Sequence, residues 1–309
     1  MIFIAATISF LLVHLAPGDP FSSTLESVSV HPAVKQALRK EFGLDRPVGE
    51  QYVRFLGQLA RGNLGRSTMR PGPAIDVLVQ ALPNTLLLMG TALVLSFAGG
   101  VALGAWQASR AGTHGDRVVS ATSLVLASLP ELWVGSILLL LLAVRFPLLP
   151  TGGTVEILMH DTMSPLGRIL DRARHLVLPA LTLALLGIAS VARYQRAALL
   201  DVLPQDFVRT ARAKGVPDRV VLWRHALRNA LVPTIVLAGL SLPTLLGGAV
   251  FVEQVFSWPG LGRVAAKAFG ERDYQVVIGA TMFGAVLVVA GGIVADLCHA
   301  AVDPRVRVR

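Results

Sequence analysis

Long apolar stretches recur along this chain, and they decide what it can fold into. A helix needs roughly 20 apolar residues to cross the ~30 Å hydrocarbon core of a bilayer. Five windows approach or exceed that length: Leu82–Trp106, Val118–Val144, Leu176–Ala192, Ala230–Val252 and Val276–Ala300. Because 53% of the 309 residues are hydrophobic and only 15% are charged, the composition excludes an ordinary soluble domain. The sequence therefore predicts an all-α membrane protein.

A sixth apolar stretch, Met1–Leu15, opens the chain. Fifteen residues at a rise of ~1.5 Å cover only ~22 Å, so we expect this span to be cut short at its start. The stretch has neither the basic n-region nor the small-residue cleavage site of a signal peptide before the turn at 17–20. We interpret it as a retained transmembrane helix, which brings the expected number of spans to six.

The distribution of Lys and Arg predicts which loops face the cytoplasm. Short cytoplasmic loops carry an excess of these residues. With the most basic segment inside, the inside segments are 107–117, 193–229 and 300–309, and together they hold 13 of the 28 Lys and Arg residues in a small part of the chain. We therefore expect both termini to be cytoplasmic and the long segment 16–81 to lie outside, ahead of a core domain over 82–309.

The outside segment 16–81 shows two stretches with apolar residues at helical spacing. One runs from Pro32 to Phe42 and the other from Pro47 to Ala60. We expect two short amphipathic helices whose apolar faces pack against the membrane domain rather than bind a ligand. The turn at 62–67 then leads to the second span.

Polar and helix-breaking residues inside the apolar windows mark the positions of greatest interest. Pro130 and Glu131 fall near the middle of the third expected span, Val118–Val144, where a carboxylate is costly unless it faces water, a partner or the protein interior. Glu131 is either a residue that borders a translocation pathway or a protonated or snorkelling carboxyl beside a kink. Pro243 is expected to break the fifth span, Ala230–Val252, at its centre, either to line a cavity or as a simple packing kink.

Several functional classes find no support in the sequence. The seven histidines include no pair at i, i+4 spacing and there is one cysteine, so we expect no metal site. No phosphate-binding loop and no protease or hydrolase motif is present, so we expect no catalytic residues and no nucleotide bound by this chain. The net charge of +9 lies in loops that flank the membrane, without a basic-aromatic surface, and we therefore expect no nucleic-acid partner.

The segment 193–229 holds a basic, helix-forming stretch, Asp206-Phe-Val-Arg-Thr-Ala-Arg-Ala-Lys-Gly215, followed by a second basic helix up to Asn229. This stretch resembles the cytoplasmic loop of ATP-binding-cassette importer permeases, although Arg209 and Thr210 replace the Glu-Ala of the general pattern. The fuller string, together with Gly62-Asn-Leu-Gly-Arg-Ser67 and Glu253-Gln-Val-Phe-Ser-Trp-Pro-Gly-Leu-Gly262, resembles the first, B-type permease of dipeptide, oligopeptide and nickel importers.

The resemblance implies a six-span, type I permease fold in a bacterial or archaeal inner membrane. It implies a heterodimer with a second, C-type permease, two cytoplasmic ATPase subunits that bind ATP and Mg²⁺, and an extracytoplasmic substrate-binding protein. It also implies that a short helix around Ala211–Asp218 docks on an ATPase. The coupling residues implied are Arg209, Thr210, Ala211, Arg212, Ala213, Lys214, Gly215, Val216, Pro217, Asp218 and Arg219.

The segment from Glu253 to Tyr274 is the matching feature at the outer side. By resemblance it lies under the binding protein, and Trp258, Pro259 and Gly260 are candidates for an outer gate. The alternative is an interfacial helix anchored by the ring of Trp258.

Two other classes stay open from the sequence. A secondary carrier or channel transports without ATPase partners, although such a carrier normally has more intramembrane ionisable groups than Glu131 alone. An assembly protein tolerates scrambling of Ala211–Asp218. The sequence does not name the cargo, which in this permease type includes dipeptides, longer peptides, nickel chelates and glutathione.

Overall fold

The computed structural model describes residues 2–15, 46–67, 69–247 and 249–302. Within these ranges the regular secondary structure is helical, apart from an isolated bridge between Arg66 and Pro73. The predicted all-helical class is therefore confirmed for the described part of the chain. The helix expected from Pro32 to Phe42 lies outside the described residues.

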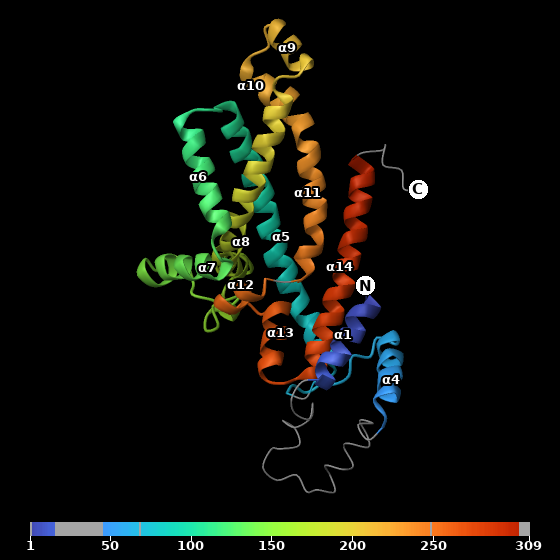
Figure 1. Ribbon diagram of the computed structural model, residues 1–309. Coiled ribbons are helices and arrows are strands. Elements are labelled where there is room, and N and C mark those ends of the chain that lie inside the picture. Colours follow the sequence, from blue (N-terminus) through green and yellow to red (C-terminus); the bar gives the residue numbers. More distant parts are fainter. Residues whose placement is uncertain (1, 16–45, 68, 248, 303–309) are drawn as a thin grey trace.

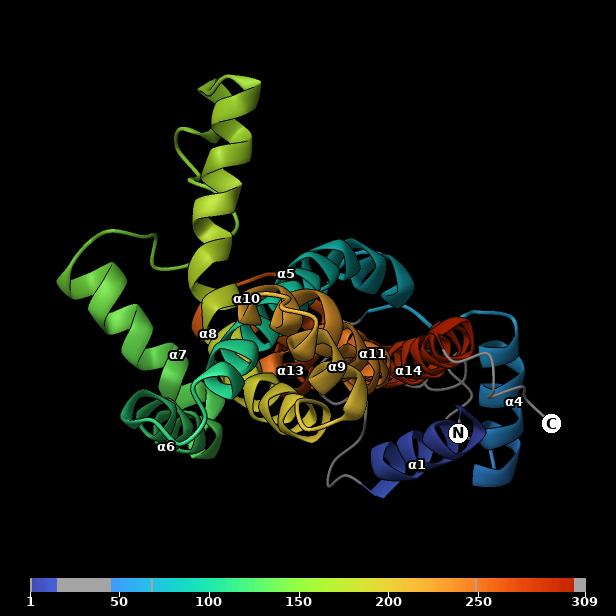
Figure 2. The same ribbon diagram turned by 90° about the horizontal axis from the view of Figure 1, so that it is seen from above.

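Four long helices form the body of the molecule (Figure 1). They are α5 (Ala74–Ser109), α8 (Pro165–Val202), α11 (Leu227–Gly247) and α14 (Tyr274–Val302). The helix α5 packs mainly against α8, and α11 packs mainly against α14. Seen from above, the first turns of α8 project away from this bundle (Figure 2).

Glycines allow the α5–α8 pair to pack closely. A Cβ at Gly100 would lie 2.5 Å from Cβ of Val191, and one at Gly104 would lie 2.6 Å from the carbonyl oxygen of Ala192. Neither distance is tolerable for real atoms. The two glycines therefore allow the close approach of α5 and α8, the two longest helices, which lie side by side.

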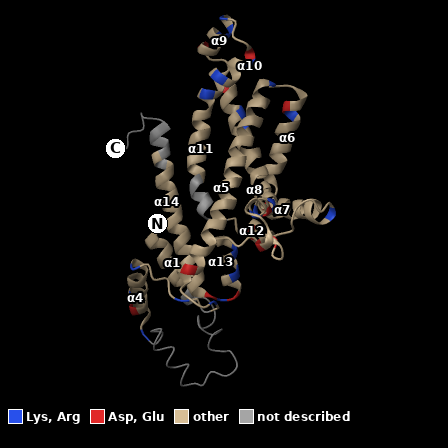
Figure 3. Cartoon of the chain, turned by 180° about the vertical axis from the view of Figure 1, so that it is seen from behind, with Lys and Arg blue, Asp and Glu red and all other residues tan. Residues whose placement is uncertain are grey.

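Three of the described helices are long and apolar enough to cross a membrane: Ala74–Ser109, Pro165–Val202 and Tyr274–Ala295. A fourth span is added if the bent pair His114–Ser128 and Glu131–Arg145 counts as one. A shorter apolar helix covers Ile2–Leu12. Charged side chains gather toward the ends of the bundle and along the connecting segments, while the middles of the long helices are mostly uncharged (Figure 3). The chain is thus a multi-pass membrane protein.

The third expected span, Val118–Val144, is not a single kinked helix. The helix α6 (His114–Ser128) ends before Pro130, and α7 (Glu131–Leu139) with the π-helical turn η1 (Leu140–Arg145) leaves at an angle of 104°. Leu129 adopts an extended conformation (φ −80°, ψ 139°) because the ring of a following proline disfavours the helical region. Pro130 and Glu131 lie near the middle of this bent pair, as expected, but they form a corner between two helices and not a kink within one.

The expected break at Pro243 is also not found. The helix α11 continues through Pro243 to Gly247, and α12 (Val250–Val255) begins after Ala249. In the same way α5 continues through Pro83 and α8 through Pro179. A proline inside a helix removes one hydrogen bond, and helices packed on their neighbours tolerate this loss within a membrane bundle.

At one end of the bundle lie α1 (Ile2–Leu15), α4 (Val48–Ala60), α12 and α13 (Leu261–Gly270), and at the opposite end lie α9 (Asp206–Ala213) and α10 (Asp218–Val220) (Figure 1). The apolar face of α4 packs against α1 and α14 through Phe55, Leu56 and Leu59. The phenol oxygen of Tyr52 lies 2.7 Å from Oγ1 of Thr7. The predicted amphipathic helix over 47–60, with its packing role, is confirmed.

Candidate functional site

The α8–α11 connection, residues 203–226, projects beyond the end of the helical bundle (Figure 1). It consists of α9, a tight turn, α10 and the π-helical turn η3 (Val221–Ala226). Val208, Ala211 and Val221 are buried in one apolar cluster with residues at the ends of α8 and α11. The connection is therefore a packed extension of these two helices and not a loose loop.

A sharp turn at Gly215 ends α9. The N–H of Gly215 donates to the carbonyl of Arg212 (2.9 Å), and the N–H of Val216 donates to the carbonyl of Ala211 (3.2 Å). These two hydrogen bonds, together with the positive φ of the glycine, form a Schellman motif. Gly215 has φ +77°, a conformation that a side chain strains. Gly215 therefore provides the sharp exit from α9.

The helix expected within 206–215 is confirmed as α9, which runs from Asp206 to Ala213. The short docking helix implied around Ala211–Asp218 is wrong in its bounds, because the positive φ of Gly215 prevents the helix from continuing. Pro217 is the N-cap of α10. Of the eleven predicted coupling residues, 209–213 lie in α9, 214–217 form the turn and 218–219 open α10.

Two of the predicted cations are held by neighbours within the connection. The guanidinium Nε of Arg212 donates to Oδ1 of Asp218 (3.0 Å), which links α9 across the turn to α10. The guanidinium of Arg209 lies 3.9 Å from the carboxylate of Asp206, and its side chain is 72% exposed. Thr210 donates to the carbonyl of Asp206 along the helix. Arg212 thus braces the turn, whereas Arg209 presents its charge outward.

The exposed face of the connection also carries aromatic side chains that the sequence analysis did not select. Phe207 is 38% exposed and Trp223 is 47% exposed, and they accompany the exposed cations Lys214 and Arg219. Arg and aromatic residues are enriched at the centres of protein interfaces. The sequence feature that could have indicated this exposure is the position of Phe207, which directly precedes Val208 and so lies beside the apolar face formed by Val208 and Ala211. The surface is suited to docking another protein.

A second cluster lies at the opposite end of the bundle, where α12 leads into α13. Trp258 is fully buried, and its Nε1 donates to the carbonyl of Asn84 on α5 (2.9 Å). The alternative reading of Trp258 as an interfacial anchor is therefore wrong, since the ring faces the protein core and not the bilayer surface. Pro259 is half-buried and accepts a hydrogen bond from the Asn84 amide (3.1 Å).

Glu253 organises this second cluster, and the sequence analysis missed it. The carboxylate is fully buried and accepts bonds from the hydroxyl of Thr85 (2.8 Å) and the N–H of Arg263 (2.9 Å). The Thr85 hydroxyl oxygen in turn accepts from the N–H of Leu261 (2.7 Å). Burial raises the pKa of the Glu253 carboxyl, while these donors stabilise its charged form. A carboxylate at the first turn of α13 also complements the helix dipole.

Position 260 must be glycine because the side chains of Glu253 and Thr85 pack directly against it. A Cβ at Gly260 would lie 2.3 Å from Oε1 of Glu253 and 2.5 Å from Oγ1 of Thr85. Of the three predicted gate residues, Trp258 and Gly260 are therefore buried and fixed against α5. The segment is a rigid corner between α12, α13 and α5.

The predicted pathway residues occupy two separate elements. Pro130 caps α7, and Glu131 follows it as the first residue of that helix. The Oε1 atom of Glu131 is buried and has no hydrogen-bond partner among the described residues. Pro243 lies in α11. An unpartnered carboxyl oxygen is costly, so Glu131, like the buried Gln107 whose Oε1 also has no partner among the described residues, is a candidate for a partner from outside this chain.

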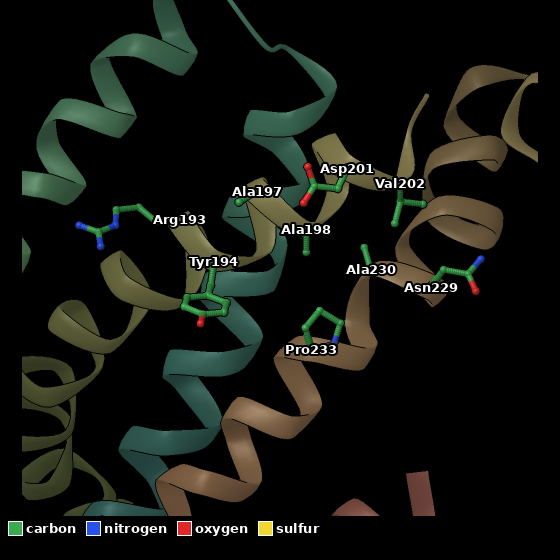
Figure 4. A pocket seen from close by; sticks show the side chains of 9 residues that line it. All are labelled: Arg193, Tyr194, Ala197, Ala198, Asp201, Val202, Asn229, Ala230 and Pro233. Carbon is green, nitrogen blue, oxygen red and sulfur yellow. The ribbon is translucent and has the colours of Figure 1, made fainter. Parts of the chain in front are cut away.

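A groove of about 490 Å³ lies between the last turns of α8 and the first turns of α11, beside the connection (Figure 4). Its lining residues are Arg193, Tyr194, Ala197, Ala198, Asp201, Val202, Asn229, Ala230 and Pro233. We call it the α8–α11 groove. In the described ranges, no group of three or more His, Cys, Asp or Glu side chains is placed to hold a metal ion.

Residues 100–308 match the family described as "Binding-protein-dependent transport system inner membrane component". The chain belongs to this family. The matched region includes the α8–α11 connection, Glu253 with α12 and α13, and the whole of α8, α11 and α14, whereas Asn84 and Thr85 of α5 precede it. The match, together with the relatives below, confirms the resemblance stated from the sequence, and the multi-pass chain is an inner-membrane transport component.

Curated members of the permease family align with almost the whole chain. The oligopeptide transport system permease protein AppB of Bacillus subtilis (strain 168) is 40% identical over 304 residues, covering 97% of this chain and 93% of that protein. The di/tripeptide transport system permease protein DppB of Pseudomonas aeruginosa (strain UCBPP-PA14) is 38% identical over 313 residues, with the same coverage. The dipeptide transport system permease protein DppB of Escherichia coli (strain K12) is 34% identical over 321 residues, covering 99% and 95%.

Proposed function

We propose that this chain is one permease subunit of an ATP-driven importer for peptides or related small solutes. The similar proteins carry the names of oligopeptide, dipeptide and di/tripeptide transport permeases. The observation that carries the mechanism is the α8–α11 connection, an exposed cationic and aromatic surface built directly onto two long helices. This surface is where an ATPase subunit docks.

The connection transmits force because its parts are rigid. The helix α9 is held to the bundle by Val208 and Ala211, and the Arg212–Asp218 bond holds the turn. When the two ATPases close on ATP, the docked α9 is displaced, and α8 and α11 follow as continuous helices. The residues 209–219 therefore act together as the coupling unit, with Arg209, Lys214 and Arg219 pairing with acidic groups of the ATPase.

The proposed assembly has four further components. A second, C-type permease forms a heterodimer with this chain, two cytoplasmic ATPases bind ATP and Mg²⁺, and an extracytoplasmic binding protein delivers the cargo. The family description, which names binding-protein-dependent transport, supports this set. The lipid bilayer surrounds the six proposed spans, which are α1, α5, the bent α6–α7 pair, α8, α11 and α14.

The proposed topology places the α8–α11 connection and both termini in the cytoplasm. The helices α4 and α13 then lie at the outer side, under the binding protein. The placement of α9 and α13 at opposite ends of the bundle supports this topology (Figure 1). In this orientation Trp258, Pro259 and Gly260 belong to the outer gate, and Pro130, Glu131 and Pro243 to the translocation pathway.

Reconstitution distinguishes the importer from a carrier or channel. Uptake of radiolabelled tri-alanine is measured in proteoliposomes that contain this chain alone, the permease pair, or the complete complex with binding protein. An importer subunit gives uptake only with the complete complex and ATP. Nucleotide-independent uptake by this chain alone contradicts the proposal and favours the carrier or channel.

A further inference from the structure

The α8–α11 groove is lined by an apolar floor and two opposite charges. Val202 and Ala230 are buried at its floor, while Arg193 and Asp201 are exposed at its rim. Figure 4 shows these side chains on the two helices that lead into the connection. Among the described residues, neither Arg193 nor Asp201 forms a side-chain ion pair with another group. Both charges are free to hold a ligand.

The spacing of the two charges matches a short peptide. Arg193 and Asp201 are eight residues apart on α8, which corresponds to ~12 Å along the helix axis. Three extended residues span about 10 Å, so the terminal charges of a tripeptide reach both ends of the groove once the side chains adjust. A single amino acid is too short to reach both.

The polarity of α8 gives the direction of binding. The helix ends at Val202, where its last carbonyl groups present partial negative charge beside Asp201. An ammonium group is therefore favoured at that end by both the carboxylate and the helix dipole. The guanidinium of Arg193 suits a carboxylate, which it can bind through two parallel hydrogen bonds.

Two other lining residues suit the middle of a peptide. Tyr194 is 57% exposed and offers a ring face and a hydroxyl, and the amide of Asn229 donates to His225 (3.0 Å) and keeps its carbonyl oxygen for a peptide N–H. We propose that the α8–α11 groove is a binding site for short peptides with free termini, with the ammonium at Asp201 and the carboxylate at Arg193. The orientation of this site toward the cytoplasm rests on the proposed function.

Such a site makes imported peptide a ligand of the coupling helices. A bound peptide contacts α8 through its charges and α11 through Asn229, so it restrains the relative movement of the two helices that carry the connection. Peptide that accumulates inside then slows the next transport cycle.

The test uses the complete complex in nanodiscs and three probes: tri-alanine, N-acetyl-tri-alanine and tri-alanine amide. Binding is measured by calorimetry for the wild type and for Asp201→Asn, Arg193→Gln and the control Arg117→Gln, an exposed arginine on α6 outside the groove. We expect Asp201→Asn to weaken tri-alanine about threefold to fivefold, with no effect on the acetylated probe. Arg193→Gln should weaken tri-alanine by a similar factor and leave the binding of tri-alanine amide unchanged. Arg117→Gln should bind all three probes as the wild type does.

The proposal is overturned if each substitution affects all three probes equally, or affects none of them. A structure of the heterodimer in which a partner helix fills the groove also overturns it. The uptake assay of the complete complex separates this inference from the proposed function. Uptake without the charge-specific binding pattern rejects the groove site alone. The binding pattern without ATP-driven uptake rejects the importer and keeps the site.

Discussion

Thr85 and Glu253, which are 168 positions apart in the chain, share a buried hydrogen bond of 2.8 Å. The same Thr85 hydroxyl accepts from the first N–H of α13, and the same carboxylate accepts from Arg263. One buried group thus joins α5, α12 and α13. The α12–α13 segment is held on the end of a long helix, so a movement of α5 is expected to carry α13 with it.

Glu253→Gln should destabilise this corner. The amide has one acceptor oxygen in place of two, so one of the buried donors on Thr85 or Arg263 loses its partner, at a cost of about 1–3 kcal/mol. Thermal unfolding in mild detergent measures the loss. The control Glu271→Gln removes a partly exposed carboxylate 3.6 Å from Lys267, and its effect should stay below ~0.5 kcal/mol. Equal effects of both substitutions contradict the role assigned to Glu253.

Gly260→Ala should disturb the same corner through space alone. The new methyl group would lie 2.3 Å from the Glu253 carboxylate, whereas Gly270→Ala at the other end of α13 meets nothing within 4 Å. Overpacking of this kind costs about 1–3 kcal/mol. We expect Gly260→Ala to reduce uptake while Gly270→Ala does not. Transport by Gly260→Ala at the wild-type rate rules out a gate that depends on this packing.

Gly215→Pro should uncouple ATP hydrolysis from uptake while membrane insertion stays intact. Proline fixes φ near −65° and has no N–H, so it is incompatible with φ +77° and removes the bond to Arg212. The milder Gly215→Ala keeps the N–H and strains φ by about 1 kcal/mol. The ratio of ATP hydrolysed to peptide imported should rise strongly for the proline variant and little for the alanine variant. Normal uptake by Gly215→Pro refutes the coupling role.

Glu131→Gln separates a pathway role from a structural one. If Glu131 pairs with cargo or water during translocation, as we propose, removing its charge lowers the uptake rate about tenfold, equivalent to ~1.4 kcal/mol, and leaves thermal stability unchanged. The control Glu156→Gln changes an exposed carboxylate in the segment before α8 and should do neither. A loss of stability together with normal uptake assigns Glu131 to the fold alone.

Local signals in the sequence predicted some features well. Apolar length located α5, α8 and α14, and the glycine at position 215 located the turn because its conformation is decided by its immediate neighbours. Prolines were less informative. Pro130 bends the chain by 104°, yet Pro243 lies within a continuous helix, and the difference depends on packing that the local sequence does not contain.

Long-range contacts account for what the sequence could not show. Glu253 reads as an ordinary surface acid until Thr85 of α5 is placed against it, and Trp258 reads as an interfacial anchor until Asn84 accepts its N–H. The exposure of Phe207 likewise follows only from the way in which Val208 and Ala211 bury the opposite face of α9.

Photo-crosslinking of α9 tests the central claim most directly. Benzoylphenylalanine replaces Phe207 in the complete complex, and Phe269 of α13, 76% exposed at the opposite end of the bundle, serves as the control position. Crosslinks are analysed without nucleotide and with trapped ATP. The account predicts that position 207 crosslinks to an ATPase subunit in at least one nucleotide state and position 269 does not. Absence of an ATPase crosslink from position 207 in every state would contradict it.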